Sequence, residues 1–467
     1  MDVKIGLETH VQLDTDTKLF CGCSTESSDQ PNSQVCEVCL GMPGSKPRPN
    51  EKAVRYAVKA ALALGCRINN RSFFSRKTYF YPDMSKNFQI TQYEIPVGEE
   101  GTVFIESEDE RKEIDVERVH IEEDPAKLVH KGGDIASADY VLADYNRSGT
   151  PLIEIVTRPD FESPSEARTF LRKLTRILRY VGVYDPSADL TIKSDANISI
   201  EGGSKVEVKN ITGTKAIERA LSYEMMRQKN RRRKEGDVKQ ETRGFDAGQG
   251  ITKPLRMKES EAGYGYIFEP DLPELSSEDR EESAEEEMPE LPDEKLERFQ
   301  EQYQISSQLA KSLVRTPEIA NDFEELASRH EPQLVASWMA GELKKNLNYR
   351  EISYEEPSIT IDWFETLLEF IEDDKISDRN AEMLIREMLD NPRDPEKIAE
   401  EEDLLSTEEL DVEGTAEEVL EENQDAVEDY REGKEEALNF LVGKIMERSG
   451  AKADPKEARE ILLEKLG

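Results

Sequence analysis

The sequence predicts an α+β fold: an N-terminal domain with a mainly antiparallel sheet, an all-helical domain, and a small helical C-terminal tail domain. Residues 141–161 and 188–213 alternate apolar and polar side chains between turn residues, which is typical of half-buried strands. Residues 51–64 and 163–182 repeat apolar side chains at helical spacing. Between residues 295 and 395, helical patterns with caps follow one another without an alternating run.

Two acidic stretches separate these regions. Residues 276–294 are acidic and interrupted by proline, and they predict a solvated boundary. Residues 400–429 contain fifteen acidic and no basic residues, and they predict a second segment that is linker-like or lies on the surface. We therefore expect a first domain over residues 1–290, a helical domain over 291–400 and a tail domain over 401–467. Two amphipathic helices at the end of the tail are expected, with Pro455 in the first turn of the second.

The composition is strongly acidic, with 101 Asp and Glu against 62 Lys and Arg and a formal net charge of -39. Such a surface stays soluble at high salt, so a salt-loving source is expected. The mean hydropathy is -0.71, and no apolar run reaches membrane-spanning length. The N-terminus does not resemble a signal peptide, so a cytoplasmic location and no membrane association are expected.

Four of the five cysteines lie within residues 21–39. Cys21 and Cys23 form one close pair and Cys36 and Cys39 another, with twelve residues between the pairs. The cytosol keeps thiols reduced, which disfavours disulfides, and two closely spaced thiolate pairs suit a tetrahedral structural Zn²⁺. The alternative is four reduced cysteines without a metal. Cys66 follows an apolar run and is expected to be a small buried side chain.

Three polar clusters within the first domain carry the residue types of a metal or phosphate site. They are the stretches GLETHVQL, HIEEDPAKLVH and DYNRSGTPLIEIV, and the segment 76–97 between the first two is rich in Tyr, Phe, Gln and basic residues. Glu8 and His10 would share one face of a strand. Carboxylates with a neutral imidazole can hold Mg²⁺, and Arg or Lys can neutralise a transferring phosphoryl group. Taken alone, the EED triplet is more often a solvated acidic face, and a lone histidine such as His10 is more often structural than a metal ligand.

The same stretches resemble the B-subunit family of the glutamine-dependent aspartyl/glutamyl-tRNA amidotransferases. The resemblance runs in order over essentially the whole chain. The stretches that carry it are GLETHVQL, CGCSTESSDQPNSQVCEVCLGMPGS, RKTYFYPDMSKNFQITQYEIP, HIEEDPAK, DYNRSGTPLIEIVTRPD, KSDANISI, VEVKNITGTKAIERAL, QETRGFD, FEPDLPEL and FLVGKIM.

The resemblance implies a ligase subunit that uses ATP and Mg²⁺. It would phosphorylate the side-chain carboxylate of misacylated Asp-tRNA(Asn) or Glu-tRNA(Gln). Ammonia from glutamine would then form the amide, and it would be supplied by an amidase, the A subunit of the complex. A small C subunit would complete a heterotrimer. The tail would resemble a YqeY domain and bind tRNA. The resemblance does not decide which of the two misacylated tRNAs is the substrate.

The resemblance also implies site residues. It places Mg²⁺ ligands at His10, Glu123 and Glu154, with Glu122 as a close rival to Glu123. The residues expected to contact phosphate or substrate are Glu8, Lys77, Tyr81, Lys86 and Arg147. Tyr79 and Phe80 are as well explained by core packing. The four cysteines match those family members that bind zinc.

Some features depart from the family or leave alternatives open. Pro125 and Ala126 replace the Ala-Gly of many relatives, and the string KNITGTKAIERAL is unusual, which leaves the contacts of that loop open. Residues 225–236 form a basic segment, which either contacts RNA or is an exposed helix face. A related archaeal subunit carries a synthetase-like insert for which residues 275–400 have no room. The main alternative function is a non-catalytic, zinc-containing scaffold that binds tRNA.

Overall fold

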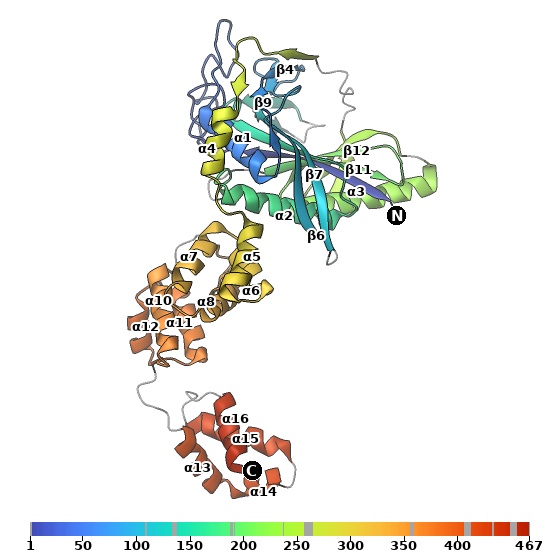
Figure 1. The fold of residues 1–467 in the computed structure, drawn as a ribbon. Helices are drawn as coiled ribbons and strands as arrows, with labels where there is room; N and C mark the ends of the chain where they lie inside the picture. Colours follow the sequence, from blue (N-terminus) through green and yellow to red (C-terminus); the bar gives the residue numbers. More distant parts are fainter. Residues whose placement is uncertain are drawn as a thin grey trace. The chain divides into compact units, whose positions relative to one another are not determined.

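The computed structural model describes residues 2–107, 110–132, 138–186, 190, 192–236, 238–255, 265–354, 359–405, 412–431, 434–448 and 455–466. The chain divides into two compact units, Met1–Pro292 and Asp293–Gly467. The first combines strands and helices and the second is helical (Figure 1), so the predicted α+β class is confirmed. Among the helices described, none is both long and apolar enough to cross a membrane.

A large sheet of nine strands organises the first unit. Its strands are β1 (Val3–Gln12), β2 (Arg67–Ile68), β6 (Gly98–Ser107), β7 (Glu110–Glu123), β10 (Pro151–Thr157), β11 (Ile192–Ile200), β12 (Val206–Thr212), β13 (Glu241–Asp246) and β14 (Ile251–Pro254). Their order is β14-β13-β12-β11-β1-β10-β7-β6-β2. Every neighbouring pair is antiparallel except β12 and β13, so the predicted mainly antiparallel sheet is confirmed. The N-terminal strand β1 thus lies in the middle of the sheet, and residues far apart in sequence flank it.

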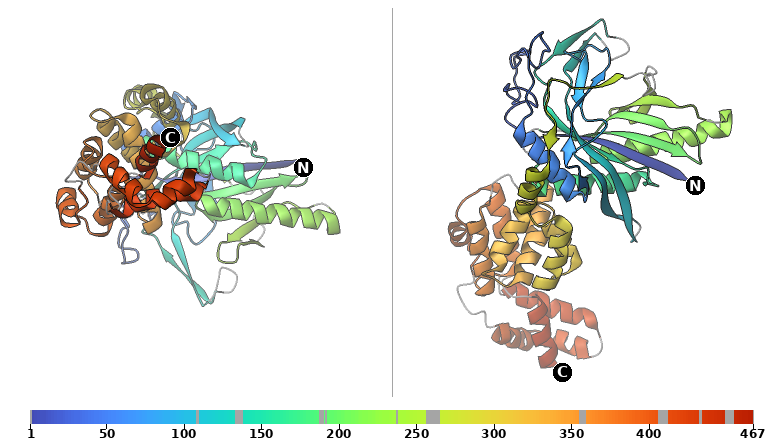
Figure 2. Two further views of the ribbon diagram at one scale, coloured as in Figure 1. Left: turned by 90° about the horizontal axis from the view of Figure 1, so that it is seen from below. Right: turned by 45° about the horizontal axis from the view of Figure 1, so that its top comes forward.

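The alternation along β1 gives the sheet one apolar and one polar face. Ile5, Leu7 and Val11 are buried, whereas Glu8 and His10, on the opposite face, are only partly buried. Three helices cover the apolar face: α1 (Glu51–Ala63), α2 (Pro164–Tyr180) and α3 (Thr214–Glu235). They pack on β6, β7, β11 and β12 (Figures 1 and 2). The polar face of the central strands is therefore the face on which chemistry can occur.

The first two helices confirm the helical predictions over 51–64 and 163–182. Asn50 caps α1 by accepting a hydrogen bond from the amide of Ala53. Ser163 caps α2 by accepting from the amide of Glu166, and Pro164 occupies the first helical position. Both caps satisfy amides that would otherwise lack a partner at a buried helix start.

Smaller sheets flank the polar face. They are formed by β3 (Arg71–Ser72) with β16 (Leu275–Ser276), by β4 (Ser75–Thr78) between β15 (Gly265–Phe268) and β5 (Phe88–Thr91), and by β8 (Lys127–Lys131) with β9 (Tyr140–Asp144). The acidic stretch 276–294 is not only a solvated boundary. It contains helix α4 (Glu278–Glu286), which packs on α1 and places Ala284 in the core. Its acidic side chains point outward because only one of its faces is covered.

Among its described residues, the second unit forms helices and one isolated antiparallel bridge, between Ile376 and Leu405. Its helices are α5 (Pro292–Tyr303), α6 (Ser307–Leu313), α7 (Pro317–Ala327), α8 (Pro332–Ser337), η3 (Trp338–Leu343), α9 (Lys344–Arg350), α10 (Ile361–Glu372), α11 (Asp378–Asp390), α12 (Pro395–Glu401), α13 (Val412–Glu422), α14 (Gln424–Arg431), α15 (Glu435–Arg448) and α16 (Pro455–Leu466). Helices α13 to α16 share one hydrophobic cluster. The predicted helices at the end of the chain are α15 and α16, with Pro455 starting the second.

Of the two alternatives predicted for residues 400–429, the linker is wrong where α13 and α14 form, whereas a surface position agrees with the exposed acidic side chains of these helices. Residues 406–411 lie outside the described part of the chain. Val412, Ala416 and Val419 recur at helical spacing and are buried in α13. The acidic residues occupy the remaining faces of α13 and α14, so a high acid content conceals two amphipathic helices.

Candidate functional site

The polar face of the sheet brings three distant polar residues side by side. His10 on β1 lies directly opposite Glu154 on β10, and Glu154 lies directly opposite His120 on β7. Residues in register on neighbouring strands point to the same face. Glu122, two residues after His120, therefore points to this face as well. The strand register thus gathers residues separated by more than a hundred positions.

His10, Glu122 and Glu154 form a compact donor group. The His10 Nε2 atom lies 3.3 Å from Glu122 Oε1 and 3.5 Å from Glu154 Oε2. Neighbouring ligands of an octahedral cation at about 2.1 Å would be about 3.0 Å apart, which is close to these spacings. The side chains of Glu122 and Glu154 are 5% and 10% exposed, whereas that of His10 is 26% exposed. One nitrogen and two carboxylates therefore suit a divalent cation at a position that is open to solvent on the His10 side.

The electrostatics of this group show how closely its charges interact. Burial raises the pKa of Glu122, and the neighbouring carboxylate of Glu154 raises it further. Burial alone would also raise the pKa of Glu154, but the imidazoles of His120 and His10 hold it well below its usual range. Burial opposes a charge on His10, yet Glu154 and Glu122 raise the pKa of His10 to about 10. Two buried carboxylates thus attract positive charge, as a cation site requires.

Glu123 is not part of this group, in contrast to its prediction as a metal ligand. Adjacent residues of a strand point to opposite faces, so Glu123 faces away from Glu122. Its carboxylate pairs with the ammonium of Lys86 and accepts a hydrogen bond from the amide of Ile90 at 2.8 Å. Its carbonyl oxygen accepts from the Gln89 amide side chain at 2.8 Å. Glu123 and Lys86 therefore hold the segment before β5 against the end of β7, and Glu122 takes the place predicted for Glu123.

A second acidic group lies beside the first. Glu8, Asp195 and Glu207 each direct a carboxylate oxygen into a shared group. Lys209 donates to Asp195 at 2.7 Å and lies 2.6 Å from Glu207, so its ammonium partly neutralises the group. Burial raises the pKa of Glu8, and the carboxylate of Glu154 raises it further. The structure thus places Glu8 next to the donor group, as a neighbour of Glu154.

The remaining predicted contact residues differ in their placement. Lys77 on β4 lies close enough for its ammonium to lower the pKa of Glu122. Tyr81 is 47% exposed, in the loop that follows β4. Arg147 donates to the carbonyl oxygens of Pro125 and Ala126, both at 3.0 Å, and its side chain lies 3.2 Å from the carboxylate of Asp124.

Among the predicted cations, Lys77 is thus one whose charge acts on the donor group, whereas Arg147 secures the turn that follows β7. The packing alternative for Phe80 is wrong, because that ring is 91% exposed. Tyr79 is partly buried.

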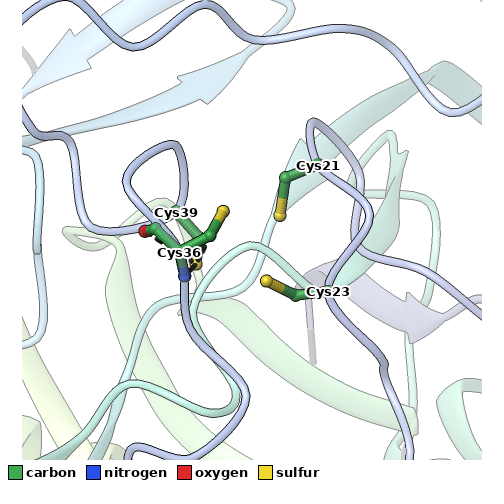
Figure 3. Close-up of side chains that lie close together, drawn as sticks. All are labelled: Cys21, Cys23, Cys36 and Cys39. Carbon is green, nitrogen blue, oxygen red and sulfur yellow. Dashed lines mark hydrogen bonds between the residues drawn. The ribbon is translucent and has the colours of Figure 1, made fainter.

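The four clustered cysteines converge, as Figure 3 shows. Two sulfurs come from the loop that carries Cys21 and Cys23 and two from the loop that carries Cys36 and Cys39, and all four lie within 4.8 Å of one another. The Sγ atoms of Cys36 and Cys39 are 4.0 Å apart. A tetrahedral zinc at about 2.3 Å from each sulfur needs sulfurs about 3.8 Å apart. The four thiols are thus arranged so that they can hold a metal such as zinc.

A buried lysine links this cysteine group to the rest of the first unit. Lys18 is 1% exposed, and its ammonium donates to the carbonyl oxygens of Gln34 at 2.9 Å and Tyr145 at 3.3 Å. It also lies 3.8 Å from the sulfur of Cys39. The hydrogen bond with Cys21 is the largest of the interactions that together lower the pKa of Cys39 to about 5, and the positive charge of Lys18 is one of the smaller ones. Lys18 therefore favours a thiolate next to the metal position.

The third polar cluster also links the cysteine loop to the rest of the first unit. Its contributing residues are Asp144 and Asn146. Asp144 accepts a hydrogen bond from the amide of Asn32 at 3.0 Å. Asn146 accepts from the amide of Gln34 at 2.8 Å and donates to the carbonyl oxygen of Gln30 at 2.8 Å. The cysteine loop thus rests on the segment that leads into β10, which carries Glu154.

Two contributors were not predicted to belong to a site. His120 lies 3.3 Å from the carboxylate of Glu154, and it orients that carboxylate from the side opposite His10. The period-2 spacing of His120 and Glu122 is the sequence signal that places both on one face. Lys18 carries no such signal, because a lysine in a loop is usually solvated.

Comparison with known proteins shows what the whole chain is similar to. The family model described as the GatB/GatE catalytic domain matches residues 3–282, and the model described as the GatB domain matches residues 321–466. The chain is 44% identical over 480 residues to the B subunit of the aspartyl/glutamyl-tRNA(Asn/Gln) amidotransferase of Haloquadratum walsbyi, with 99% of this chain and 96% of that relative covered.

Two further relatives carry the same name. That of Natronomonas pharaonis is 45% identical, with 98% of this chain and 96% of the relative covered. That of Methanococcoides burtonii is 43% identical, with 99% and 97% covered. Halophilic archaea are prominent among the matches, in keeping with the acidic composition. The similarity spans both compact units.

Proposed function

The chain belongs to the family of aspartyl/glutamyl-tRNA(Asn/Gln) amidotransferase B subunits, and on this premise we propose that it activates a misacylated tRNA for amidation. Its substrates are ATP and an aspartyl or glutamyl residue esterified to tRNA(Asn) or tRNA(Gln). Its product is an acyl phosphate, which ammonia converts to the amide. The observation that carries the proposal is the convergence of His10, Glu122 and Glu154 on one face of the sheet.

The chemistry needs activation because a free carboxylate has no good leaving group. One oxygen of the side-chain carboxylate attacks the γ-phosphorus of ATP. The bond from that phosphorus to the bridging oxygen breaks, and ADP leaves with the electron pair. Ammonia then attacks the acyl carbon, the bond from that carbon to the phosphate oxygen breaks, and inorganic phosphate leaves. The surplus proton of the added ammonia passes to phosphate or solvent.

The residues of the donor group supply charge and position for the first step. His10, Glu122 and Glu154 hold a divalent cation, Mg²⁺ in this proposal, which when bound neutralises phosphate charge. His120 holds the Glu154 carboxylate in place. Lys77, on the strand beside this group, supplies a positive charge toward the γ-phosphate. Glu8 lies next to the donor group, and Tyr81 lies on the exposed side, where it meets the substrate.

The remaining parts of the proposal concern assembly. Ammonia comes from an amidase partner, and a small third protein completes a heterotrimer in the cytoplasm. Residues 1–290 form the catalytic domain, 291–400 a helical domain, and 401–467 a tail that binds tRNA. The four cysteines hold a structural Zn²⁺, since their spacing leaves no ligand position open for chemistry.

The alternative is a non-catalytic scaffold that binds tRNA and carries a structural zinc. The complex should be incubated with ATP, hydroxylamine and either Asp-tRNA(Asn) or Glu-tRNA(Gln), without glutamine. Hydroxylamine traps an acyl phosphate as a hydroxamate, so we expect ATP-dependent hydroxamate with at least one of the two tRNAs. Absence of hydroxamate with both, in a complex that binds tRNA, would establish the scaffold. The tRNA that reacts identifies the substrate.

Lys18 offers a separate test of the zinc site. The Lys18→Met variant keeps the length of the buried side chain and removes its charge next to Cys39. We expect zinc affinity to fall about 10- to 100-fold, because groups that contact metal ligands tune affinity by that amount. Competition with a chromogenic chelator measures it. Lys4→Met, at an exposed position of β1, is the control. Equal zinc affinity in the two variants would show that Lys18 does not support the site.

A further inference from the structure

The basic side chains of residues 225–236 fall into two sets, which differ in whether they bind other protein groups. The side chains of the inner set donate hydrogen bonds to other groups of the protein. Arg227 donates to the carboxylates of Glu224 and Glu241, both at 2.7 Å. Arg232 donates to the carbonyl oxygens of Ile200 and Glu201, at 2.5 and 3.1 Å. These arginines tie α3 to the end of β11 and the start of β13, and their donors are engaged by protein groups.

The outer set consists of two exposed side chains and one partly buried side chain, that of Lys229. Arg233 and Lys234 are exposed in the last turn of α3, and Lys229 lies one turn before Arg233 on the same side of the helix. In the part of the chain that the structure describes, no hydrogen bond or ion pair engages these three side chains. The last turns of α3 extend beyond the neighbouring strands, so this end of the helix is open (Figure 2).

The fold adds two lysines from other segments. Strands β12 and β13 run parallel and begin in register at Val206 and Glu241. Lys205 and Lys239 lie just before these two positions and are exposed. The contact of Arg232 with Ile200 and Glu201 holds the end of α3 near the turn that leads into β12.

We call Lys205, Lys229, Arg233, Lys234 and Lys239 the α3 basic patch. Among the described residues, none of its members has an acidic partner. The patch contrasts with the rest of a chain whose formal net charge is -39. Acidic side chains are abundant enough to neutralise most surface cations, as they neutralise Arg227 and Lys253.

We propose that the α3 basic patch binds the sugar-phosphate backbone of the tRNA substrate, an inference that rests on the proposed function. Cations on long flexible side chains match phosphates without needing a base sequence. In an otherwise acidic surface that repels RNA, such a patch also orients the approach of the nucleic acid.

An acidic protein partner fits the patch less well. Stable protein interfaces have an apolar, often aromatic centre inside a polar rim. The exposed large apolar side chain on this part of α3 is Met226, at 62% exposure, and the patch itself contains only charged side chains. The observations therefore favour a phosphate backbone.

The test replaces all five patch residues with Gln in the full chain, assembled with its amidase partner. The probe is misacylated tRNA, and its affinity is measured over a series of salt concentrations. We expect the slope of log K against log salt to become shallower by about 0.7–0.9 for each lost phosphate contact. In turnover assays the KM for tRNA should rise on the order of tenfold at low salt, with kcat unchanged.

Two controls separate charge from other effects. A variant that exchanges Lys for Arg and Arg for Lys at the five positions keeps the charge and should keep both slope and KM. Lys215→Gln changes the same helix at its other end, and should affect affinity less than Lys234→Gln. Unchanged slope and affinity in the five-residue Gln variant would overturn the proposal. So would weaker assembly of the complex with unchanged tRNA affinity, which would assign the patch to a protein partner.

The result is independent of the proposed chemistry. If the patch proposal fails, the Gln variant still forms hydroxamate at the original tRNA concentration. If the proposed function fails, no hydroxamate forms at saturating tRNA in any variant, including the unmodified chain.

Discussion

Glu122→Gln is expected to lower ATP-dependent hydroxamate formation by at least about a thousandfold, because it removes one carboxylate from a donor group that concentrates positive charge on transferring phosphate. The neighbouring change, Glu123→Gln, is expected to act on stability. It leaves the ammonium of Lys86, a residue whose side chain is 9% exposed, without its carboxylate partner. Breaking a buried ion pair from one side costs about 3–5 kcal/mol of unfolding free energy. Of these two adjacent residues, Glu122 is therefore expected to affect activity and Glu123 to affect stability.

Both variants are measured in the same two assays, hydroxamate formation and thermal unfolding without added metal. Glu122→Gln should not lower Tm, because it removes one of two buried carboxylates that repel each other. Glu113→Gln, at an exposed position of β7, is the control for both assays. If Glu123→Gln lost activity at full stability while Glu122→Gln retained it, the assignment of Glu122 to the donor group would be wrong.

Cys39→Ser is expected to abolish stoichiometric zinc binding and to unfold the loop that the metal organises. Cys39 is 3% exposed and contacts both Cys36 and Lys18. Structural zinc contributes apparent binding free energies of about 10–16 kcal/mol in small zinc-binding peptides, so loss of the metal should cost this loop its structure. The loop lies against Asp144 and Asn146, and loosening should extend toward the start of β10.

Metal analysis gives the zinc content, and amide hydrogen exchange reports on residues 18–40 and 144–150. Cys66→Ala is the matched control, because Cys66 is a buried cysteine outside the cluster. It should keep one zinc per chain and normal protection in both segments. Full zinc content and unchanged exchange in Cys39→Ser would contradict a four-cysteine zinc site.

Much of the architecture follows from local patterns. The alternation in β1 is enough to place Glu8 and His10 on one face and Ile5 and Leu7 on the other. The helices over 51–63 and 164–180 follow from apolar periodicity and from their caps. The paired cysteine spacing predicts a metal site before any coordinates, because only a few spacings let four thiols surround one ion.

A prediction from composition fails where many acidic residues surround a few apolar residues at helical spacing. Residues 400–429 are so rich in acid that they resemble a linker, yet buried Val412, Ala416 and Val419 make α13 amphipathic. A net charge count averages over all faces of a helix, whereas folding depends on the one face that is buried.

Other features depend on which strands become neighbours. The family resemblance leaves Glu122 and Glu123 as rival ligands, because the two glutamates are adjacent in the motif. The pairing of β7 with β10 and of β10 with β1 turns Glu122 toward His10, and it turns Glu123 toward Lys86. The parallel pairing of β12 and β13 likewise brings Lys205 close to Lys239. The burial of Lys18 instead depends on the loops that carry Gln34 and Tyr145. Periodicity tells which side chains of one strand share a face, but the contacts of that face are set by the register between strands distant in sequence.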